Sequence, residues 1–229
     1  MATKYLTFSY DDGVRQDIRL IELFRRYGMK GTFNMNTGSL GHVGHIMHQG
    51  FDVCFDKVCA DEVHDVYAGF EVAMHGVDHR NFPGLTDAEL DAEVCNNMKE
   101  IETLTGEKVV GGAYPCGVFD DTIADRLRAR GIGYCRTIKD THSFAVPEDF
   151  NIWHPTCHDN DDRAMELAEQ FIALEAETPS VFYIWGHAFE LDKPDRDRWY
   201  RMEKLLEKLA GHDDICYAEN REIFAALAK

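Results

Sequence analysis

Thr7-Phe8-Ser9-Tyr10-Asp11-Asp12-Gly13, near the N-terminus, is the stretch around which the rest of this chain is organised. The apolar run that begins at Tyr5 predicts a strand, which stops at two adjacent carboxylates and a glycine. Side chains alternate between the faces of a strand, so Asp11 and Asp12 can point differently, one at a metal ion and the other at water or substrate. A plain Asp-Asp-Gly turn explains the same residues, and the rest of the chain has to decide between the two.

The size and composition of the chain favour one domain. Its 229 residues, 45% of them hydrophobic, are enough for one α/β domain with a full core. The sequence contains no fixed-period repeat, no low-complexity segment and no linker rich in proline, serine or charge. We therefore expect a single domain over residues 1–229.

The formal net charge of −17 restricts the partners. Nucleic acid and anionic membranes attract clustered cations, so neither is expected here, and a neutral or cationic substrate fits better. A solvated acidic surface would carry the same charge without any binding role. No apolar run is long enough to span a bilayer and no signal-peptide core precedes the first strand, so we expect a cytoplasmic protein. The seven cysteines form no CxxC pair, which favours reduced thiols.

Strand patterns alternate with helical ones along the whole chain. Such alternation predicts parallel strands joined by right-handed crossovers, which close or nearly close into a βα barrel. The helices are marked by caps such as Gly28, the Thr86 to Glu89 capping box and Asp120. The predicted strands are 5–10, 31–35, 70–74, 109–114, 132–137, 181–185 and 215–217.

Polar residues follow the ends of several of these strands. His75 and His79 are four apart, a spacing that lets two ring nitrogens meet at one ion. Glu71 and Asp78 are candidate acceptors that would orient a ligand imidazole, although either could simply be exposed. Because the carboxyl ends of barrel strands share one mouth, these side chains are expected to gather there with the others that follow strands, namely Asp11, Asp12, Pro115, Arg136 and His187.

Two irregular stretches have weaker patterns. Residues 36–57 are predicted to be a long glycine-rich loop, and residues 138–161 a loop of the kind that often binds ligand. The first carries His42, His45 and His48, which could form a second metal site but fit surface histidines better. The second carries residues that suit either substrate contact or packing under the loop: His142, Trp153, His154 and His158.

Four motifs, in this order, resemble those of the polysaccharide deacetylase family, carbohydrate esterase family four, which includes the chitooligosaccharide deacetylase homology domain. They are SYDDG at 9–13, HGVDH at 75–79, AYPCG at 113–117 and WGH at 185–187. The resemblance covers nearly the whole chain and implies a distorted seven-stranded (β/α) barrel and a metal-dependent deacetylase.

The resemblance also implies roles for individual residues. Asp12, His75 and His79 would hold the metal, Asp11 would be the general base, and His187 the general acid. The backbone N–H of Cys116 would stabilise the oxyanion, and the other residues expected near the substrate or oxyanion are Tyr114, Pro115 and Trp185. A nucleophilic role for the Cys116 thiol is the competing interpretation, although it would need its own histidine base.

The sequence departs from the family pattern at two places. Ala113 stands where the third motif usually opens with an arginine, and Arg136, one strand later, is a candidate to reach the same carboxylate. The Asp-Trp fourth motif is not evident, and residues 153–158 are a candidate replacement. Both departures, with the missing secretion signal, argue against a polymer substrate.

The expected function is hydrolysis of a carbon–nitrogen bond other than a peptide bond, removing acetyl groups from N-acetylated sugars or small amides. Zinc is the expected ion, and an Asp with two His would also accept cobalt or nickel. A small molecule or short oligosaccharide is the expected substrate, and a homo-oligomer is left open. The alternatives are a hydrolase of cyclic amides or imides, whose relatives include some without a metal, and a sugar-binding module that has lost catalysis.

Overall fold

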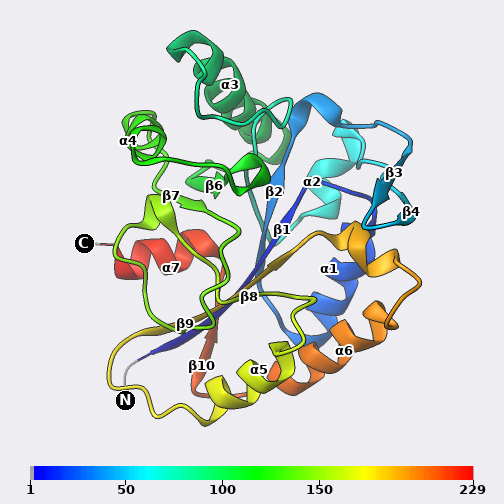
Figure 1. Ribbon diagram of the computed structural model, residues 1–229, viewed down its shortest axis with the longest axis vertical. Coiled ribbons are helices and arrows are strands. Elements are labelled where there is room, and N and C mark those ends of the chain that lie inside the picture. Colours follow the sequence, from blue (N-terminus) through cyan, green and yellow to red (C-terminus); the bar gives the residue numbers. More distant parts are fainter. Residues whose placement is uncertain (1–2, 229) are drawn as a thin grey trace.

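A parallel sheet curled into a distorted barrel dominates the computed structural model, which describes residues 3–228 (Figure 1). The strands lie in the order β7-β6-β5-β2-β1-β9-β8, and β10 also pairs with β1, beside its first residues. The predicted barrel is thus confirmed. Their bounds are β1 Lys4–Asp11, β2 Gly31–Met35, β5 Glu71–Met74, β6 Gly111–Ala113, β7 Tyr134–Arg136, β8 Cys157–His158, β9 Ser180–Gly186 and β10 Ile215–Tyr217.

The segment around Trp153 joins the two ends of the sheet. Trp153 forms a parallel bridge with Arg136 on β7, and Thr156 donates its N–H to the carbonyl of Tyr183 on β9 at 2.8 Å. β8 then pairs with β9. This part of the predicted 138–161 loop therefore closes the barrel, and the fully buried Trp153 packs against Tyr134 and Tyr183 instead of facing a substrate.

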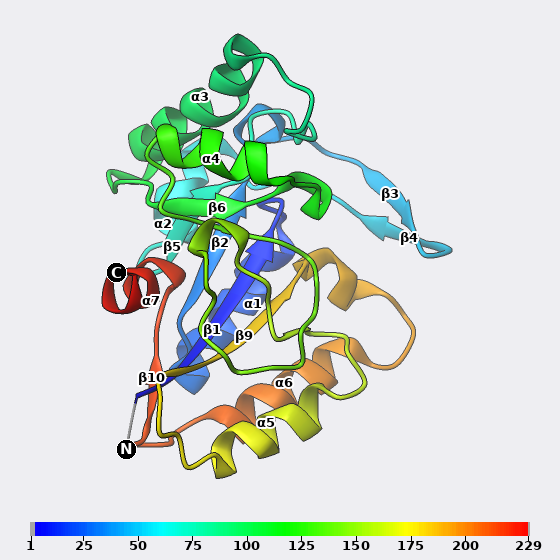
Figure 2. The same cartoon turned by 60° about the vertical axis from the view of Figure 1, so that its left-hand side comes forward.

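Helices cover the outside of the curled sheet (Figures 1 and 2). Their apolar faces are buried against it, as for Leu20 and Phe24 of α1 or Leu205 and Leu206 of α6. The predicted caps are present: Gly28 has a φ of 68°, and Asp120 accepts the N–H of Ile123. The helices are α1 Gln16–Tyr27, α2 Val63–Val66, α3 Asp87–Thr105, α4 Asp121–Ala129, α5 Ala164–Ala173, α6 Arg198–Leu209 and α7 Asn220–Leu227.

The prediction of a loop over residues 36–57 is wrong for its second half. Strands β3 (His45–His48) and β4 (Phe51–Cys54) form an antiparallel hairpin that projects from the barrel (Figure 2). Gln49 and Gly50, with φ angles of 51° and 86°, make the two-residue turn, which matches the right-handed twist of the strands. The polar histidines are tolerated because both faces of the hairpin are partly open to solvent.

The length and apolar character needed to cross a bilayer are not combined in any helix of residues 3–228.

Candidate active site

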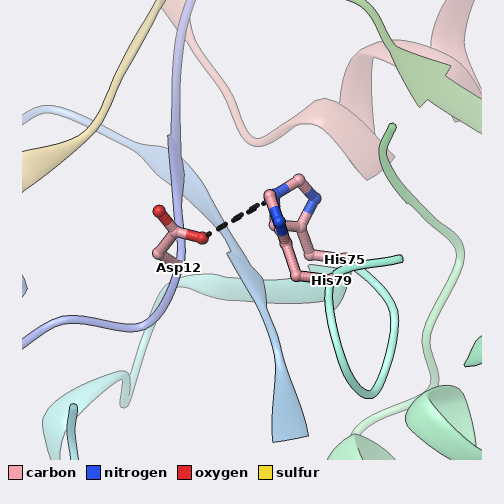
Figure 3. A group of neighbouring side chains, drawn as sticks. All are labelled: Asp12, His75 and His79. Atoms are coloured by element: carbon pink, nitrogen blue, oxygen red, sulfur yellow. Dashed lines mark ion pairs between the residues drawn. The ribbon is translucent and has the colours of Figure 1, made fainter. Parts of the chain in front are cut away.

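Asp12, His75 and His79 come together at the carboxyl end of the sheet. The Oδ1 atom of Asp12 lies 3.9 Å from Nε2 of His75 and 3.8 Å from Nε2 of His79. Figure 3 shows the carboxylate facing both imidazoles. Ligands about 2.0–2.1 Å from a tetrahedral zinc ion lie roughly 3.3 Å apart, so a small side-chain adjustment would let all three share one ion. One carboxylate and two imidazoles form a donor set that fits a divalent ion.

The backbone of Asp12 is held in an unusual conformation. Its φ is +83°, in the region of positive φ that L-residues adopt uncommonly. Its N–H donates to the carbonyl of Asn34 at 2.9 Å, and its own carbonyl accepts a hydrogen bond from the buried ammonium of Lys57 at 2.7 Å. The end of β1 is therefore fixed from both sides, and the carboxylate is aimed at the histidines.

His75 is presented in the form that a metal ligand requires. Its Nδ1 lies 2.9 Å from the carbonyl oxygen of Ala113, a pairing that assigns the proton to Nδ1 and leaves Nε2 free to bind. Burial lowers the imidazole pKa to about 4, more than the nearby Asp11 and Asp12 raise it, so the ring is neutral at pH 7. The Asn97 side chain accepts the backbone N–H of His75 and fixes the turn after β5.

The prediction that Glu71 orients a ligand histidine is wrong. Glu71 is buried, and its oxygens accept from Thr32, Tyr134 and the N–H of Arg221, away from the imidazoles. The carbonyl of Ala113, instead of Glu71, orients the His75 imidazole. A contact with a backbone atom cannot be predicted from a pattern of side chains.

Asp11 is surrounded by donors in the interior of the barrel. Its side chain is 3% exposed and forms an ion pair with Arg136, which donates two hydrogen bonds, while Asn34 Nδ2 donates at 2.8 Å. Burial alone would raise the pKa of this carboxyl, but the charge of Arg136, followed by His75 and His187, outweighs burial and lowers it. The predicted contact between Arg136 and Asp11 is confirmed.

His187 follows β9 and faces the same carboxylate. Its Nε2 lies 3.8 Å from Oδ2 of Asp11, and its Nδ1 lies 3.1 Å from Oε1 of Glu190. Burial lowers the pKa of this imidazole, but the hydrogen bond to Glu190 and the charge of Asp11 outweigh burial and raise it. An imidazole with a raised pKa therefore lies next to an ionised carboxylate, with its ring partly open to solvent. Glu190 was not predicted from the sequence. Its position three residues after His187 was the available signal.

A cleft of about 680 Å³ opens beside His187. Trp185 forms part of its wall: the indole N–H donates to Asp140 at 2.8 Å, and the ring lies against the guanidinium of Arg136. The cleft brings residues of the hairpin and of the 138–161 stretch to the site. Its other polar lining residues are His48, Gln49, His158, Asn160, Asp161, Glu190, Asp195, Arg196 and Arg198.

The remaining predicted residues have different surroundings. Pro115–Gly117 forms a tight turn in which the exposed Cys116 has a φ of 54°. The side chain of Tyr114 is buried and donates to the carbonyl of Asn151, so any contact with substrate would have to come from its backbone.

The loop histidines are spread over different places. His45 pairs with Asp52 on the exposed hairpin, while His48 reaches the cleft beside Phe189. Among residues 3–228, the candidate metal groups include none built on His42, His45 and His48. His154 lies 2.6 Å from the Thr137 hydroxyl, and His142 pairs with Asp161.

Comparison with known proteins identifies the family. The model of the family described as polysaccharide deacetylase matches residues 1–135. YxkH of Bacillus subtilis, whose name assigns it to the polysaccharide deacetylases, is 24% identical over 119 residues, which are 52% of this chain and 39% of that protein. This chain therefore belongs to the polysaccharide deacetylase family. It matches well under two thirds of the length of that relative.

Solved structures share the fold. A Mycobacterium smegmatis structure assigned to the polysaccharide deacetylases has a TM-score of 0.67 at 16% identity, covering 99% of this chain and 90% of that one. The PuuE allantoinase has a TM-score of 0.69 at 15% identity, covering 98% and 90%. At these identities the similarity concerns the barrel alone.

Proposed function

We propose that this protein is a metal-dependent hydrolase that removes acetyl groups from N-acetylated sugars or small amides. The observation that carries the proposal is the convergence of Asp12, His75 and His79 beside the ionised carboxylate of Asp11, which Arg136 and Asn34 hold in place. Family membership supports carbohydrate deacetylation. We also propose one catalytic domain over residues 1–229, because β1 pairs with β10 from the other end of the chain.

Asp12, His75 and His79 would hold the ion, for which zinc is the first choice and cobalt or nickel would also suit the donors. When bound, such an ion polarises the amide carbonyl and lowers the pKa of water from 15.7 toward about 7. Everything else in the mechanism falls to side chains and backbone groups of this chain.

Asp11 is the proposed general base. Arg136 and Asn34 keep it ionised and oriented, and it accepts the proton of the attacking water. The backbone N–H of Cys116 is the proposed donor to the oxyanion, a contact typically worth about 3 kcal/mol. His187 is the proposed general acid: Glu190 and Asp11 raise its pKa, which favours the protonated ring, and Nε2 gives its proton to the departing amine.

The cleft supports a small substrate. Its volume of about 680 Å³ is in the range typical of small-molecule sites, roughly 300–1,000 Å³. The net charge of −17 makes nucleic acid and anionic membranes poor partners. A cytoplasmic location and a homo-oligomer remain predictions.

The second candidate function is hydrolysis of a cyclic amide. The allantoinase with the same barrel over nearly the whole chain favours it, since allantoin is a small cyclic compound with amide-type C–N bonds. A sugar-binding module without catalysis is disfavoured by the intact donor set.

The test combines metal analysis with a substrate panel. Protein stripped with a chelator and then reloaded with zinc, cobalt or nickel is assayed on N-acetylglucosamine, its short oligomers and allantoin. Metal-dependent release of acetate is expected. Ring opening without acetate would establish the second function, and substrate binding without turnover at saturating metal would establish the binding module. Full activity of the stripped protein would exclude the metal-dependent mechanism.

A further inference from the structure

Glu190 is a buried carboxylate whose two oxygens are both engaged. It lies in a short 3₁₀ helix, Ala188–Asp192, directly after His187. Oε1 lies 3.1 Å from Nδ1 of His187 and 3.7 Å from Nε2 of His158. Oε2 accepts from Lys193 and from Asn160, each at 3.1 Å. With donors on both oxygens and 4% exposure, this carboxylate has little freedom to rotate.

His158 is fixed from its other side by a second buried carboxylate. Its Nδ1 lies 2.9 Å from Oδ1 of Asp159, whose Oδ2 accepts from the hydroxyl of Tyr10 at 2.8 Å. Asp159 packs so closely on Gly186 that a Cβ there would lie 2.7 Å from Oδ2. Burial lowers the pKa of His158, but the charges of Asp159 and Glu190 outweigh burial and raise it to about 10. His158 therefore lies between two carboxylates, and its Nδ1 also accepts the backbone N–H of Asn160 at 3.0 Å.

We propose that Glu190 and His158 are positioning residues for His187, the acid of the proposed function on which this inference rests. Glu190 holds the ring with Nδ1–H toward itself and Nε2 toward Asp11, and His158, packed beside Oε1, keeps Glu190 in place. This chain thereby supplies, from residues 158–190, an orienting group for the imidazole that the four sequence motifs did not contain.

The proton balance needs no further reactant. The Nε2–H bond of His187 breaks as an N–H bond forms on the departing amine, and Nδ1–H stays on its hydrogen bond to Glu190. Asp11 meanwhile carries the proton taken from water. Nε2 of His187 lies 3.8 Å from Oδ2 of Asp11, so returning that proton restores both groups.

The competing interpretation is a second metal site. Atoms of His158, His187 and Glu190 lie within 4.8 Å of one another, as ligands would. However, the buried ammonium of Lys193 lies 3.1 Å from Oε2 of Glu190 and already pairs with this carboxylate, so it would repel a second cation bound there.

A leaving-group comparison tests the proposal. An amine cannot leave without a proton, whereas 4-nitrophenolate can, so a defect in the acid should lower activity on an N-acetylated sugar and spare 4-nitrophenyl acetate. We expect Glu190→Gln to lower kcat on N,N′-diacetylchitobiose about 10- to 100-fold and kcat on the ester less than about 3-fold. His158→Gln should show the same pattern more weakly. General damage to the fold would lower both activities equally.

Glu219→Gln is the matched control. Glu219 is also a buried carboxylate in ion pairs, with Arg221 and Lys30, but it is not part of the cleft. In Glu219→Gln, the ratio of kcat on the N-acetylated sugar to kcat on the ester should equal that of the wild type. An unchanged ratio in Glu190→Gln would overturn the proposal, as would a second bound metal that Glu190→Gln releases.

A spectroscopic measurement separates this inference from the proposed function. Imidazole ¹⁵N signals of His187, assigned by their loss in His187→Ala, should show a protonated Nδ1 hydrogen-bonded to Glu190 in the wild type, and Glu190→Gln should shift that Nδ1 signal. The charged groups that face His187 are Asp11, Asp12, Glu190 and His158. If the wild type hydrolyses neither substrate, the proposed function fails. The ¹⁵N spectrum tests the positioning role independently of activity, and an unchanged spectrum in Glu190→Gln would overturn that role.

Discussion

The guanidinium of Arg136, at the end of β7, pairs with the carboxylate of Asp11, at the end of β1, although β6, β5 and β2 lie between these strands in the sheet. The contact crosses the interior of the barrel, and both side chains are at most 3% exposed. It joins residues 125 positions apart and supplies the charge that keeps the proposed base ionised.

We expect Arg136→Met to damage both stability and catalysis. Leaving Asp11 buried without its cation should lower the free energy of unfolding by about 3–5 kcal/mol. It should also raise the pKa of Asp11, so the acidic limb of kcat/KM should move to higher pH. Urea denaturation and a pH–rate profile measure the two effects, with Arg136→Lys as the charge-conserving comparison. A profile unchanged in Arg136→Met would show that Arg136 does not control the base.

Asp11 and Asp12 should separate metal binding from turnover. Asp12→Asn and His79→Ala remove a proposed ligand, so metal content and activity should fall together. Asp11→Asn should keep its metal and lose at least about 100-fold in kcat, because only the base is removed. Elemental analysis alongside acetate release checks both. Metal loss in Asp11→Asn equal to that in Asp12→Asn would contradict the division of roles.

The thiol of Cys116 should be dispensable. Its φ of 54° suits glycine, and only its backbone N–H has a proposed role. Cys116→Ser and Cys116→Gly should therefore keep kcat within about 3-fold, whereas the β-branched Cys116→Val should lose activity because strain of about 1–3 kcal/mol would distort the turn. Complete loss in Cys116→Ser with normal metal content would support the nucleophile interpretation.

Asp17, in the first turn of α1, should make stability depend on pH. Its buried carboxyl accepts from Tyr67, and its Oδ1 has no hydrogen-bond partner among residues 3–228. Burial raises its pKa from 3.8 to about 8. As pH rises, the folded state keeps this proton after the unfolded state has lost it. The stability that Asp17 contributes is therefore fully present below pH 4. It falls by about 1.4 kcal/mol per pH unit as pH rises toward 8.

Asp17→Asn removes that titration and is the test. Relative to the variant, the wild type should lose up to about 3 kcal/mol of unfolding free energy between pH 5 and pH 7.5, measured by urea denaturation. Asp65→Asn, at an exposed carboxylate of α2, is the control and should follow the wild type. Parallel curves for the wild type and Asp17→Asn would contradict the raised pKa.

Local sequence patterns predict most of the strands and helices and the residues that stand at strand ends. These features depend on local periodicity, caps and turns, and parallel strands bring their carboxyl ends to one edge wherever they lie in the chain. Asp11, Asp12, His75, His79 and His187 could be grouped for that reason, and the resemblance to the family then implied that Asp12, His75 and His79 hold the metal. The hairpin at 45–54 was missed because its alternation is half polar, with only the Gln49-Gly50 turn as a local signal.

The partners that the site residues meet depend on how the chain packs in three dimensions. Trp153 is buried in the core and His158 lines the cleft, although both residues lie in one irregular stretch of the sequence. The carbonyl of Ala113 orients His75, and Glu190 holds His187, through contacts that no motif spacing encodes. The physical reason is that these contacts depend on how far the sheet curls and on backbone atoms every residue has, and neither leaves a periodic mark in the sequence.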